Sequence, residues 1–287
     1  MSLSNPFLVD VDWLFAHLDD PNVSIVDGSW YLPDMKRDGR LEYEEQHIPG
    51  AVYFDINDVV EPGAGLPHTV ASPDVFAAKA GALGISHEHT IVVYDGMGLF
   101  SAPRVWWNFR TMGVMKVVIL DGGFPAWLEA RLPVESGTAP TYPTLFVSNP
   151  TPNAVVWLKR MTKIVADETA QVLDARPAGR FDGIDPEPRP GIRSGHMPGA
   201  LSLPFPELAE NGQLKSAEAL KDALTQAGVD LQKPIVTTCG SGVTAAALVL
   251  ALETVGHTDH ALYDGSWAEW GSLPDTPVVS EPDIKNG

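Results

Sequence analysis

Short apolar runs rich in β-branched residues alternate along this chain with longer stretches in which apolar residues recur at helical spacing. The short runs predict strands and the longer stretches predict helices, because side chains return to one face every 2.0 residues in a strand and every 3.6 in a helix. Strands are predicted at 23–27, 90–95, 116–120, 170–174, 234–239 and 260–264, and helices at 73–84, 101–113, 216–228 and 242–256. This alternation predicts an α/β protein with, in each half, a mainly parallel sheet flanked by helices on both faces.

The two halves of the chain are copies of one another. QHIPGAVYF at 46–54 recurs as GHMPGALSL at 195–203, LDGGFPAW at 120–127 as YDGSWAEW at 263–270, and SIVDGS at 24–29 as QVLDAR at 171–176. A period this long indicates a duplicated domain, because solenoid repeats run at about 20 to 50 residues. We predict an N-terminal domain at 8–138, a linker at 139–160 within a proline-rich, semi-extended stretch, and a C-terminal domain at 161–280.

Charge and composition narrow the possible partners. The chain has 287 residues and a formal net charge of -18, so its surface should repel nucleic acid and anionic membranes, leaving small molecules or proteins as partners. The single cysteine excludes an internal disulfide, and the first 35 residues carry no lysine or arginine, unlike a signal peptide. The longest apolar run is too short for a membrane helix. We therefore expect a cytoplasmic protein.

The lone thiol lies where the two copies differ. The segment TTCGSGVT places Cys239 between a predicted strand and a predicted helix, and the repeat aligns it with Asp95. Gly240 and Gly242 permit positive φ, so that backbone N–H groups can turn toward an anion, and the helix that begins near Val243 adds its positive end. Both effects stabilise a thiolate. A buried, inert cysteine is the alternative, although the first copy shows that the fold does not need a thiol there.

These segments carry a family resemblance. CGSGVTA, DARPAGRF, EPRPGIRSGHMPGA and LYDGSWAEWG together resemble the two-domain rhodanese superfamily and, within it, the 3-mercaptopyruvate sulfurtransferases. The resemblance implies two tandem rhodanese-like domains, of which the N-terminal one is catalytically silent. It also implies an enzyme that moves sulfur from 3-mercaptopyruvate through a cysteine persulfide to a thiol or cyanide acceptor and releases pyruvate. Gly240 and Ser241 match the mercaptopyruvate loop, because the thiosulfate enzymes have Arg and Lys there.

The resemblance also implies roles for particular residues. Cys239 is the nucleophile, and Ser241, His68 and an acidic residue form a proton relay. Asn57 stands where relatives have the acid, so the acidic role is either shifted by one residue, to Asp58, or absent. The substrate-binding set consists of Arg180, Arg189, Gly240, Gly242, Val243 and Thr244, with guanidinium groups suited to a keto-acid carboxylate. Arg176 and Arg193 are expected instead to pair with Asp182, Asp185 or Glu187. No cofactor and no metal are expected.

Other interpretations of the sequence stay open. A thiosulfate sulfurtransferase and a non-catalytic persulfide carrier would both use Cys239. A cysteine phosphatase would need an arginine six residues after the cysteine, where this chain has Ala245. The sequence does not identify the physiological acceptor, such as thioredoxin or another dithiol, or the oligomeric state. His47 and His196 occur in both copies, which favours a role in turns. The repeated tryptophans are expected in the core.

Overall fold

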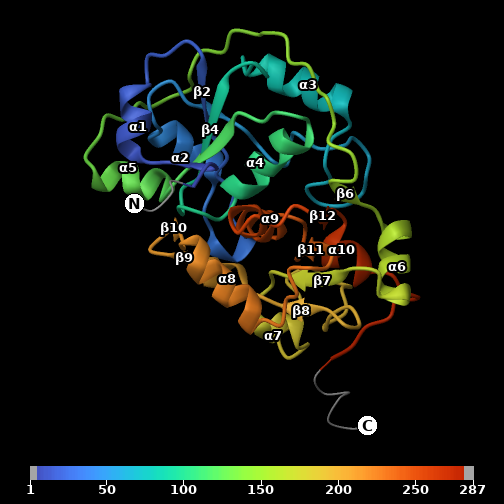
Figure 1. The fold of residues 1–287 in the computed structure, drawn as a ribbon. Coiled ribbons are helices and arrows are strands. Elements are labelled where there is room, and N and C mark those ends of the chain that lie inside the picture. The colour runs from blue at the N-terminus through green and yellow to red at the C-terminus, as the bar shows by residue number, and fades with distance from the viewer. Residues whose placement is uncertain (1–4, 281–287) are drawn as a thin grey trace. The chain divides into compact units, whose positions relative to one another are not determined.

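The computed structural model describes residues 5–280, which fall into two compact units (Figure 1). Unit 1 comprises 5–63, Val70–Thr151 and Ala209–Leu214, and unit 2 comprises Ala64–Thr69, Pro152–Leu208 and 215–280. Each unit is built on one five-stranded parallel sheet. The α/β class and the two parallel sheets predicted from the sequence are confirmed.

The sheet of unit 1 has the strand order β1-β5-β4-β2-β3. Its strands are β1 (Leu8–Val9), β2 (Val23–Asp27), β3 (Val52–Tyr53), β4 (Thr90–Tyr94) and β5 (Val117–Leu120). The helices are α1 (Val11–Ala16), α2 (Gly39–Glu45), α3 (Pro73–Ala82), α4 (Ala102–Thr111) and α5 (Gly123–Glu129), with a 3-10 turn, η1, at Pro33–Met35. Side chains of α1, α2 and α5 pack on the face formed by Ile25, Val92 and Tyr94.

Unit 2 repeats this plan with the strand order β6-β12-β11-β7-β8. Its strands are β6 (Val155–Val156), β7 (Gln171–Asp174), β8 (Leu201–Ser202), β11 (Ile235–Thr238) and β12 (His260–Tyr263). The helices are α6 (Leu158–Asp167), α7 (Ala178–Phe181), α8 (Ala217–Gln226), α9 (Ala245–Thr254) and α10 (Ser266–Trp270), with a 3-10 turn, η2, at Phe205–Leu208. In register, Asp27 lies beside Tyr94 in unit 1 as Asp174 lies beside Thr238 in unit 2.

The helices follow from local sequence. Asp10, Asp38 and Ser216 cap α1, α2 and α8 by accepting backbone N–H bonds at the exposed helix starts. Helix α9 is apolar on all sides, and residues Ala245–Leu252 are all buried. A helix of this composition is stable only inside a protein core, where burial of each large side chain contributes about 1.5–3 kcal/mol. The central helix that follows Cys239 is therefore a fixed base for the loop.

The proline-rich stretch between the copies is attached to unit 1 rather than free. The carbonyl of Gly81 accepts an N–H bond from Thr144, and the carbonyl of Met112 accepts one from Asn149. Phe146 is 4% exposed and contacts Phe76 and Phe109. Prolines prevent a ladder of backbone hydrogen bonds here, but a single aromatic anchor is enough to hold an extended segment.

Two short segments group with the opposite half of the sequence. Residues Ala64–Thr69 belong to unit 2, and the hairpin β9 (Ala209–Glu210) to β10 (Gln213–Leu214) belongs to unit 1. The hairpin is held there by a hydrogen bond from Leu214 N–H to Asp121 Oδ1 at 3.0 Å. Neither exchange was predicted from the sequence, because both segments are too short to show a hydrophobic period.

Within residues 5–280, no helix has the length and apolar character needed to cross a bilayer.

Candidate functional site

Cys239 lies directly after β11, in the turn that leads to α9, with 2% of its surface exposed. The backbone N–H of Trp267 donates to the Cys239 carbonyl at 2.9 Å, and that of Ala268 donates to the Gly240 carbonyl at 2.8 Å. The N–H of Cys239 itself donates to Ser266 Oγ at 3.3 Å. The first turn of α10 thus fixes both carbonyls of the loop, so that the backbone around the thiol has one defined course.

The two glycines of the loop serve different purposes. Gly242 has φ of +80°, a conformation that side chains disfavour. The φ of Gly240 is not positive, so the prediction that both glycines turn the chain through positive φ is wrong for Gly240. A Cβ added at Gly240 would lie 3.0 Å from Nη2 of Arg180. The guanidinium of Arg180 thus packs directly against the backbone of Gly240, and a side chain at this position would require Arg180 to shift. Helix α9 begins at Ala245, two residues later than expected, with Val243 buried and Thr244 as its N-cap residue.

Arg180 and Arg189 both come from the segment after β7, and each acts on the Cys239 loop. Arg180 forms a two-pronged ion pair with Glu187, through Nη2 to Oε2 and through Nε to Oε1 at 3.3 Å. Burial lowers the pKa of Arg189, the charge of Arg180 lowers it further, and the Cys239 thiolate opposes both effects. Within residues 5–280, the Arg189 guanidinium has no hydrogen-bonding or ion-pairing partner. Among the arginines of this segment, Arg189 is therefore the one whose charge interacts with Cys239 and whose guanidinium has no partner within the described residues.

Arg176 is fully committed to the fold, as the sequence suggested, but with a partner that was not foreseen. Its guanidinium bonds Asp174 through Nη2 at 2.7 Å, Glu187 through Nη1 at 2.8 Å and the Gly195 carbonyl at 2.9 Å. The same group lies 4.3 Å from the ring centre of Trp267. Burial alone would lower the pKa of Arg176, but the two carboxylates outweigh it and raise the pKa. Glu187 therefore holds Arg176 and Arg180 together.

Arg193 has no carboxylate partner among the residues described, which corrects the expectation of an ion pair. Its guanidinium instead donates to the carbonyls of Gly271 at 3.2 Å and Thr276 at 3.0 Å. It also reaches the carbonyls of Trp270 and Leu273. These bonds close the chain after α10, and the role of Arg193 is structural.

The corresponding loop of unit 1 is closed by its own carboxylate. Asp95 is 1% exposed and accepts five backbone N–H bonds, at 2.7–2.8 Å, from Met97, Gly98, Phe100, Ser101 and Ala102. The loop that follows β4 is therefore an anion-binding turn whose anion is supplied by the chain. This explains how the first copy keeps the loop while lacking the thiol.

The predicted relay residues have the following places. His68 belongs to unit 2, as Cys239 does, and is 6% exposed with φ of +58°. Ser241 is buried in the loop. Asp58 belongs to unit 1, where its exposed carboxylate binds Nζ of Lys79 with both oxygens at 2.8 Å. The structure thus gives Asp58 a surface ion pair, while the relay itself stays a prediction.

The repeated histidines and tryptophans are structural, as expected. His47 stacks on Tyr43 and bonds its carbonyl at 2.8 Å through Nδ1, and His196 does the same with Phe181. The tryptophans expected in the core are at most 3% exposed: Trp106, Trp107, Trp127, Trp267 and Trp270. In the described part of the chain, no group of three or more His, Cys, Asp or Glu residues could hold a metal ion.

Comparison with known proteins identifies the family. The family model described as a rhodanese-like domain matches residues 10–130 and 157–273. The chain belongs to the rhodanese family. Its two matched segments correspond to the two copies found within the sequence, so the tandem architecture inferred from the repeat is confirmed.

Several relatives of this rhodanese-family chain are named as sulfurtransferases, and the similarity extends over nearly the whole length of both proteins. The 3-mercaptopyruvate sulfurtransferase of Escherichia coli strain K12 is 43% identical, over 96% of this chain and 99% of the relative. The rat enzyme of the same name is 44% identical over 92% and 91%. The fold also matches the crystal structure of SseA from Escherichia coli, a 3-mercaptopyruvate sulfotransferase, with a TM-score of 0.84 and 41% sequence identity. The match covers 91% of this chain and 98% of the SseA chain.

Proposed function

We propose that this chain is a 3-mercaptopyruvate sulfurtransferase that carries sulfur as a persulfide on Cys239. The observation that carries the proposal is the position of Arg189. Its half-buried guanidinium interacts electrostatically with the Cys239 thiolate and has no protein partner within the described residues. Relatives with this activity in their names, at 43% and 44% identity, support the same conclusion. A guanidinium beside a thiol suits a substrate that combines a carboxylate with a transferable sulfur.

The reaction proceeds in two displacements. The Cys239 thiolate attacks the substrate sulfur, an S–S bond forms, and the C–S bond breaks with its electron pair passing to the substrate carbon as the enolate of pyruvate. The substrate thiol proton ends on that carbon, so pyruvate leaves and the enzyme holds the anion Cys–S–S⁻. An acceptor nucleophile then attacks the outer sulfur and the Cys239 thiolate is restored.

The loop after Cys239 is the group that we expect to stabilise the anionic sulfur. Its counterpart in unit 1 shows that this turn can direct five N–H groups at a single anion, the Asp95 carboxylate. Donors fixed before the reaction stabilise developing charge without reorganisation, an effect worth about 2.7–4 kcal/mol per donor in a well-studied oxyanion hole. Gly242, Val243 and Thr244 supply amides to this turn in our proposal.

Arg189 and Arg180 have different roles in binding. Arg189 is proposed to hold the substrate carboxylate directly. Arg180 is already paired by Glu187 and packs against Gly240, so it supplies positive potential and supports the loop. Ser241 and His68 are proposed to move the thiol proton, with Asp58 as the acidic member only if its carboxylate leaves Lys79.

A direct assay tests the proposal. Purified protein, given 3-mercaptopyruvate and a dithiol acceptor, should release pyruvate, whereas Cys239→Ser should not. Incubation with 3-mercaptopyruvate alone should add one sulfur to the intact mass, about 32 Da, removable by cyanide. If the wild type releases no more pyruvate than the Cys239→Ser variant, the proposal of a sulfurtransferase is refuted. The non-catalytic persulfide carrier is then the remaining interpretation.

Thiosulfate is the competing donor, since one relative is named for both substrates: thiosulfate/3-mercaptopyruvate sulfurtransferase 1 of Arabidopsis thaliana, 42% identical over 98% of this chain and 79% of the relative. We expect kcat/KM to favour 3-mercaptopyruvate, because Gly240 and Ser241 add no charge to the loop. The double variant Gly240→Arg with Ser241→Lys should shift the preference toward thiosulfate. Because Arg180 fills the space beside Gly240, this shift should be accompanied by a loss of total activity.

The acceptor and the compartment are secondary parts of the proposal. A small thiol, a dithiol protein such as thioredoxin, or cyanide would each satisfy the second displacement. A cytoplasmic location is kept as a proposal, and one relative from Arabidopsis thaliana is named as mitochondrial.

A further inference from the structure

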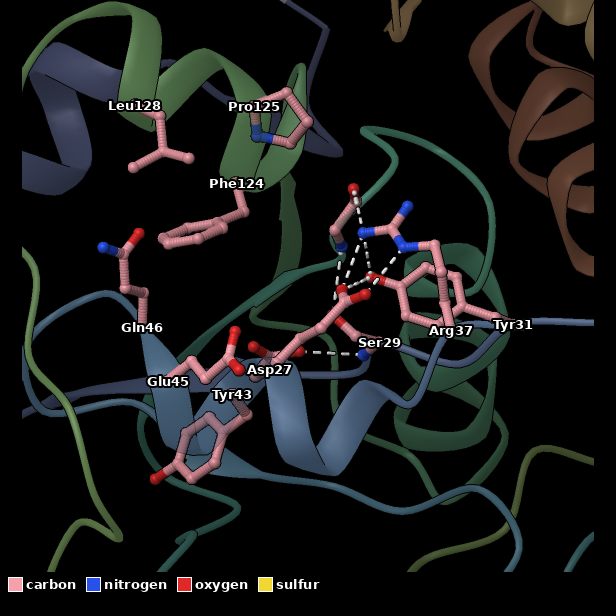
Figure 2. A pocket seen from close by; sticks show the side chains of 12 residues that line it. Asp27, Ser29, Tyr31, Arg37, Tyr43, Glu45, Gln46, Phe124, Pro125 and Leu128 are labelled. Atoms are coloured by element: carbon pink, nitrogen blue, oxygen red, sulfur yellow. Dashed lines mark hydrogen bonds and ion pairs between the residues drawn. The ribbon is translucent and has the colours of Figure 1, made fainter. Parts of the chain in front are cut away.

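Unit 1 contains a pocket that the sulfurtransferase reaction does not use. The pocket has a volume of about 490 Å³ and lies at the carboxyl ends of β2 and β4, beside α2 and α5 (Figure 2). Its lining includes three carboxylates, from Asp27, Glu42 and Glu45, against one guanidinium, from Arg37. The volume falls within the usual range of small-molecule sites, and the lining has a formal charge of -2.

The internal repeat shows what the equivalent place in unit 2 contains. There the guanidinium of Arg176 bonds Asp174, Glu187 and the Gly195 carbonyl and faces the ring of Trp267. In unit 2, therefore, two carboxylates, one carbonyl and one aromatic ring hold a planar cation.

Unit 1 keeps the residues that would surround such a cation but not the cation itself. The sequence repeat places Asp27, Gln46 and Phe124 at the positions of Asp174, Gly195 and Trp267. All three line the pocket, and Figure 2 shows Phe124 and Gln46 along one wall of it. At the position of Arg176 stands Ser29, whose short side chain leaves the space open.

The fourth contact is matched by an equivalent ion pair. Glu42 binds Arg37 through Nη2 at 2.6 Å and Nε at 2.7 Å, as Glu187 binds Arg180. The two arginines lie beside equivalent glycines: Nη2 of Arg37 is 3.3 Å from a Cβ built on Gly96, and Nη2 of Arg180 is 3.0 Å from one built on Gly240. In unit 1 the hydroxyl of Tyr31 is closer still to the Cβ built on Gly96. In unit 2, Glu187 accepts from two arginines at once. Glu42 accepts from Arg37 and, on Oε2, from the Tyr31 hydroxyl at 2.6 Å, so Oε1, which among the described residues accepts only from Arg37 Nε, is the oxygen that can accept from a second cation.

We propose that this pocket binds a small organic cation with a planar guanidinium or amidinium group and an apolar body. The cation takes the place that Arg176 fills in unit 2, bonding Asp27 and Glu42 and lying against Phe124. Pro125 and Leu128 of α5 provide the apolar wall for the rest of the ligand. Asp27 is the anchor because it is only 3% exposed, and in the described residues its carboxylate lacks the guanidinium that neutralises Asp174.

Benzamidine is a suitable ligand for a test, and benzamide is its neutral isostere. Titration calorimetry of the full chain at about pH 8 should show benzamidine binding about tenfold or more tightly than benzamide. Asp27→Asn should abolish that difference, whereas Asp74→Asn, which removes an exposed carboxylate of α3 outside the pocket, should leave it intact.

Ser29→Arg provides a second, independent variant. It should fill the pocket from within, abolish benzamidine binding and raise the stability of unit 1. If this variant does not fold, the Asp27→Asn comparison still decides the matter. Equal affinity for the two isosteres, unchanged binding by Asp27→Asn, or no benzamidine binding to the wild type at about 10 mM would each overturn the proposal. Pyruvate release by Cys239 plays no part in these measurements, so they are independent of the proposed function.

Discussion

The ionisation of Asp27 should make the stability of unit 1 depend on pH in a way that one substitution removes. Burial raises the pKa of Asp27 from 3.8 to about 6, and the repulsion of Asp95 acts in the same direction. Hydrogen bonds from Ser29 and Tyr94 oppose the rise without cancelling it. The folded chain therefore binds this proton more tightly than the unfolded chain does.

The free energy of unfolding depends on pH because the folded and unfolded chains bind the Asp27 proton with different affinities. Well below about pH 4 the carboxyl is protonated in both states and has no effect. Between about pH 4 and pH 6 the unfolded chain releases this proton while the folded chain keeps it, so stability falls, and above about pH 7, where both states are ionised, the loss is constant. A shift from 3.8 to about 6 corresponds to about 3 kcal/mol, lost between about pH 4 and pH 8. The amide that replaces this carboxyl in the Asp27→Asn variant would be neutral throughout and would keep an oxygen to accept the Ser29 N–H bond.

Urea unfolding at a series of pH values is the measurement. The free energy of unfolding of Asp27→Asn minus that of the wild type should increase by about 3 kcal/mol from about pH 4 to pH 8. The other ionisable groups around the site, Arg37, Glu42, Glu45, Tyr43, Tyr53 and Tyr94, are common to both proteins and largely cancel in this difference. A difference that is constant with pH would refute the reasoning, and Asp74→Asn should show such a constant difference.

Three further predictions concern the loop and its arginines. Gly240→Ala should lower kcat/KM about tenfold or more in steady-state assays, because the added methyl meets Arg180 at 3.0 Å. The matched control is Gly96→Ala in unit 1, which should lower stability and leave kcat/KM unchanged. Arg189→Ala should raise KM for 3-mercaptopyruvate with an unchanged melting temperature; an unchanged KM would remove Arg189 from the binding site. Arg193→Ala should lower the free energy of unfolding by about 2 kcal/mol or more, because it leaves several carbonyls without their donor, and Arg193→Lys should restore only part of it.

The sequence predicted the elements of this fold where the pattern was strong. The strand that ends at Asp27 and the strand that precedes Cys239 lie within a residue of their predicted ends, because buried parallel strands are continuous apolar runs. The two-residue strands β1, β3, β6 and β8 were not predicted, since two residues have no period. The anchoring of the proline-rich stretch was missed for a similar reason: isolated contacts hold it, namely the ring of Phe146 and backbone hydrogen bonds at Thr144 and Asn149, and isolated contacts leave no pattern.

The candidate site shows the same division. Cys239 stood out because the repeat replaces it with Asp95, and Gly240 because of the family motif. The sequence did not indicate that Gly240 lies against the Arg180 guanidinium and does not have a positive φ, or that Arg193 binds carbonyls. It placed Glu187 near the arginines but did not reveal that this carboxylate joins two of them.

The sequence by itself determined that two similar α/β domains follow one another, that one retains a thiol where the other has a carboxylate, and which family they belong to, since all three depend on residue identity and order. Only the tertiary structure decided which charges meet. Four arginines lie within 18 residues of one another, yet two are committed to the fold, one packs against the loop and one has no partner within residues 5–280: Arg176, Arg193, Arg180 and Arg189 in that order. Charge pairing depends on distances of a few ångströms between side chains that spacing along the chain does not fix.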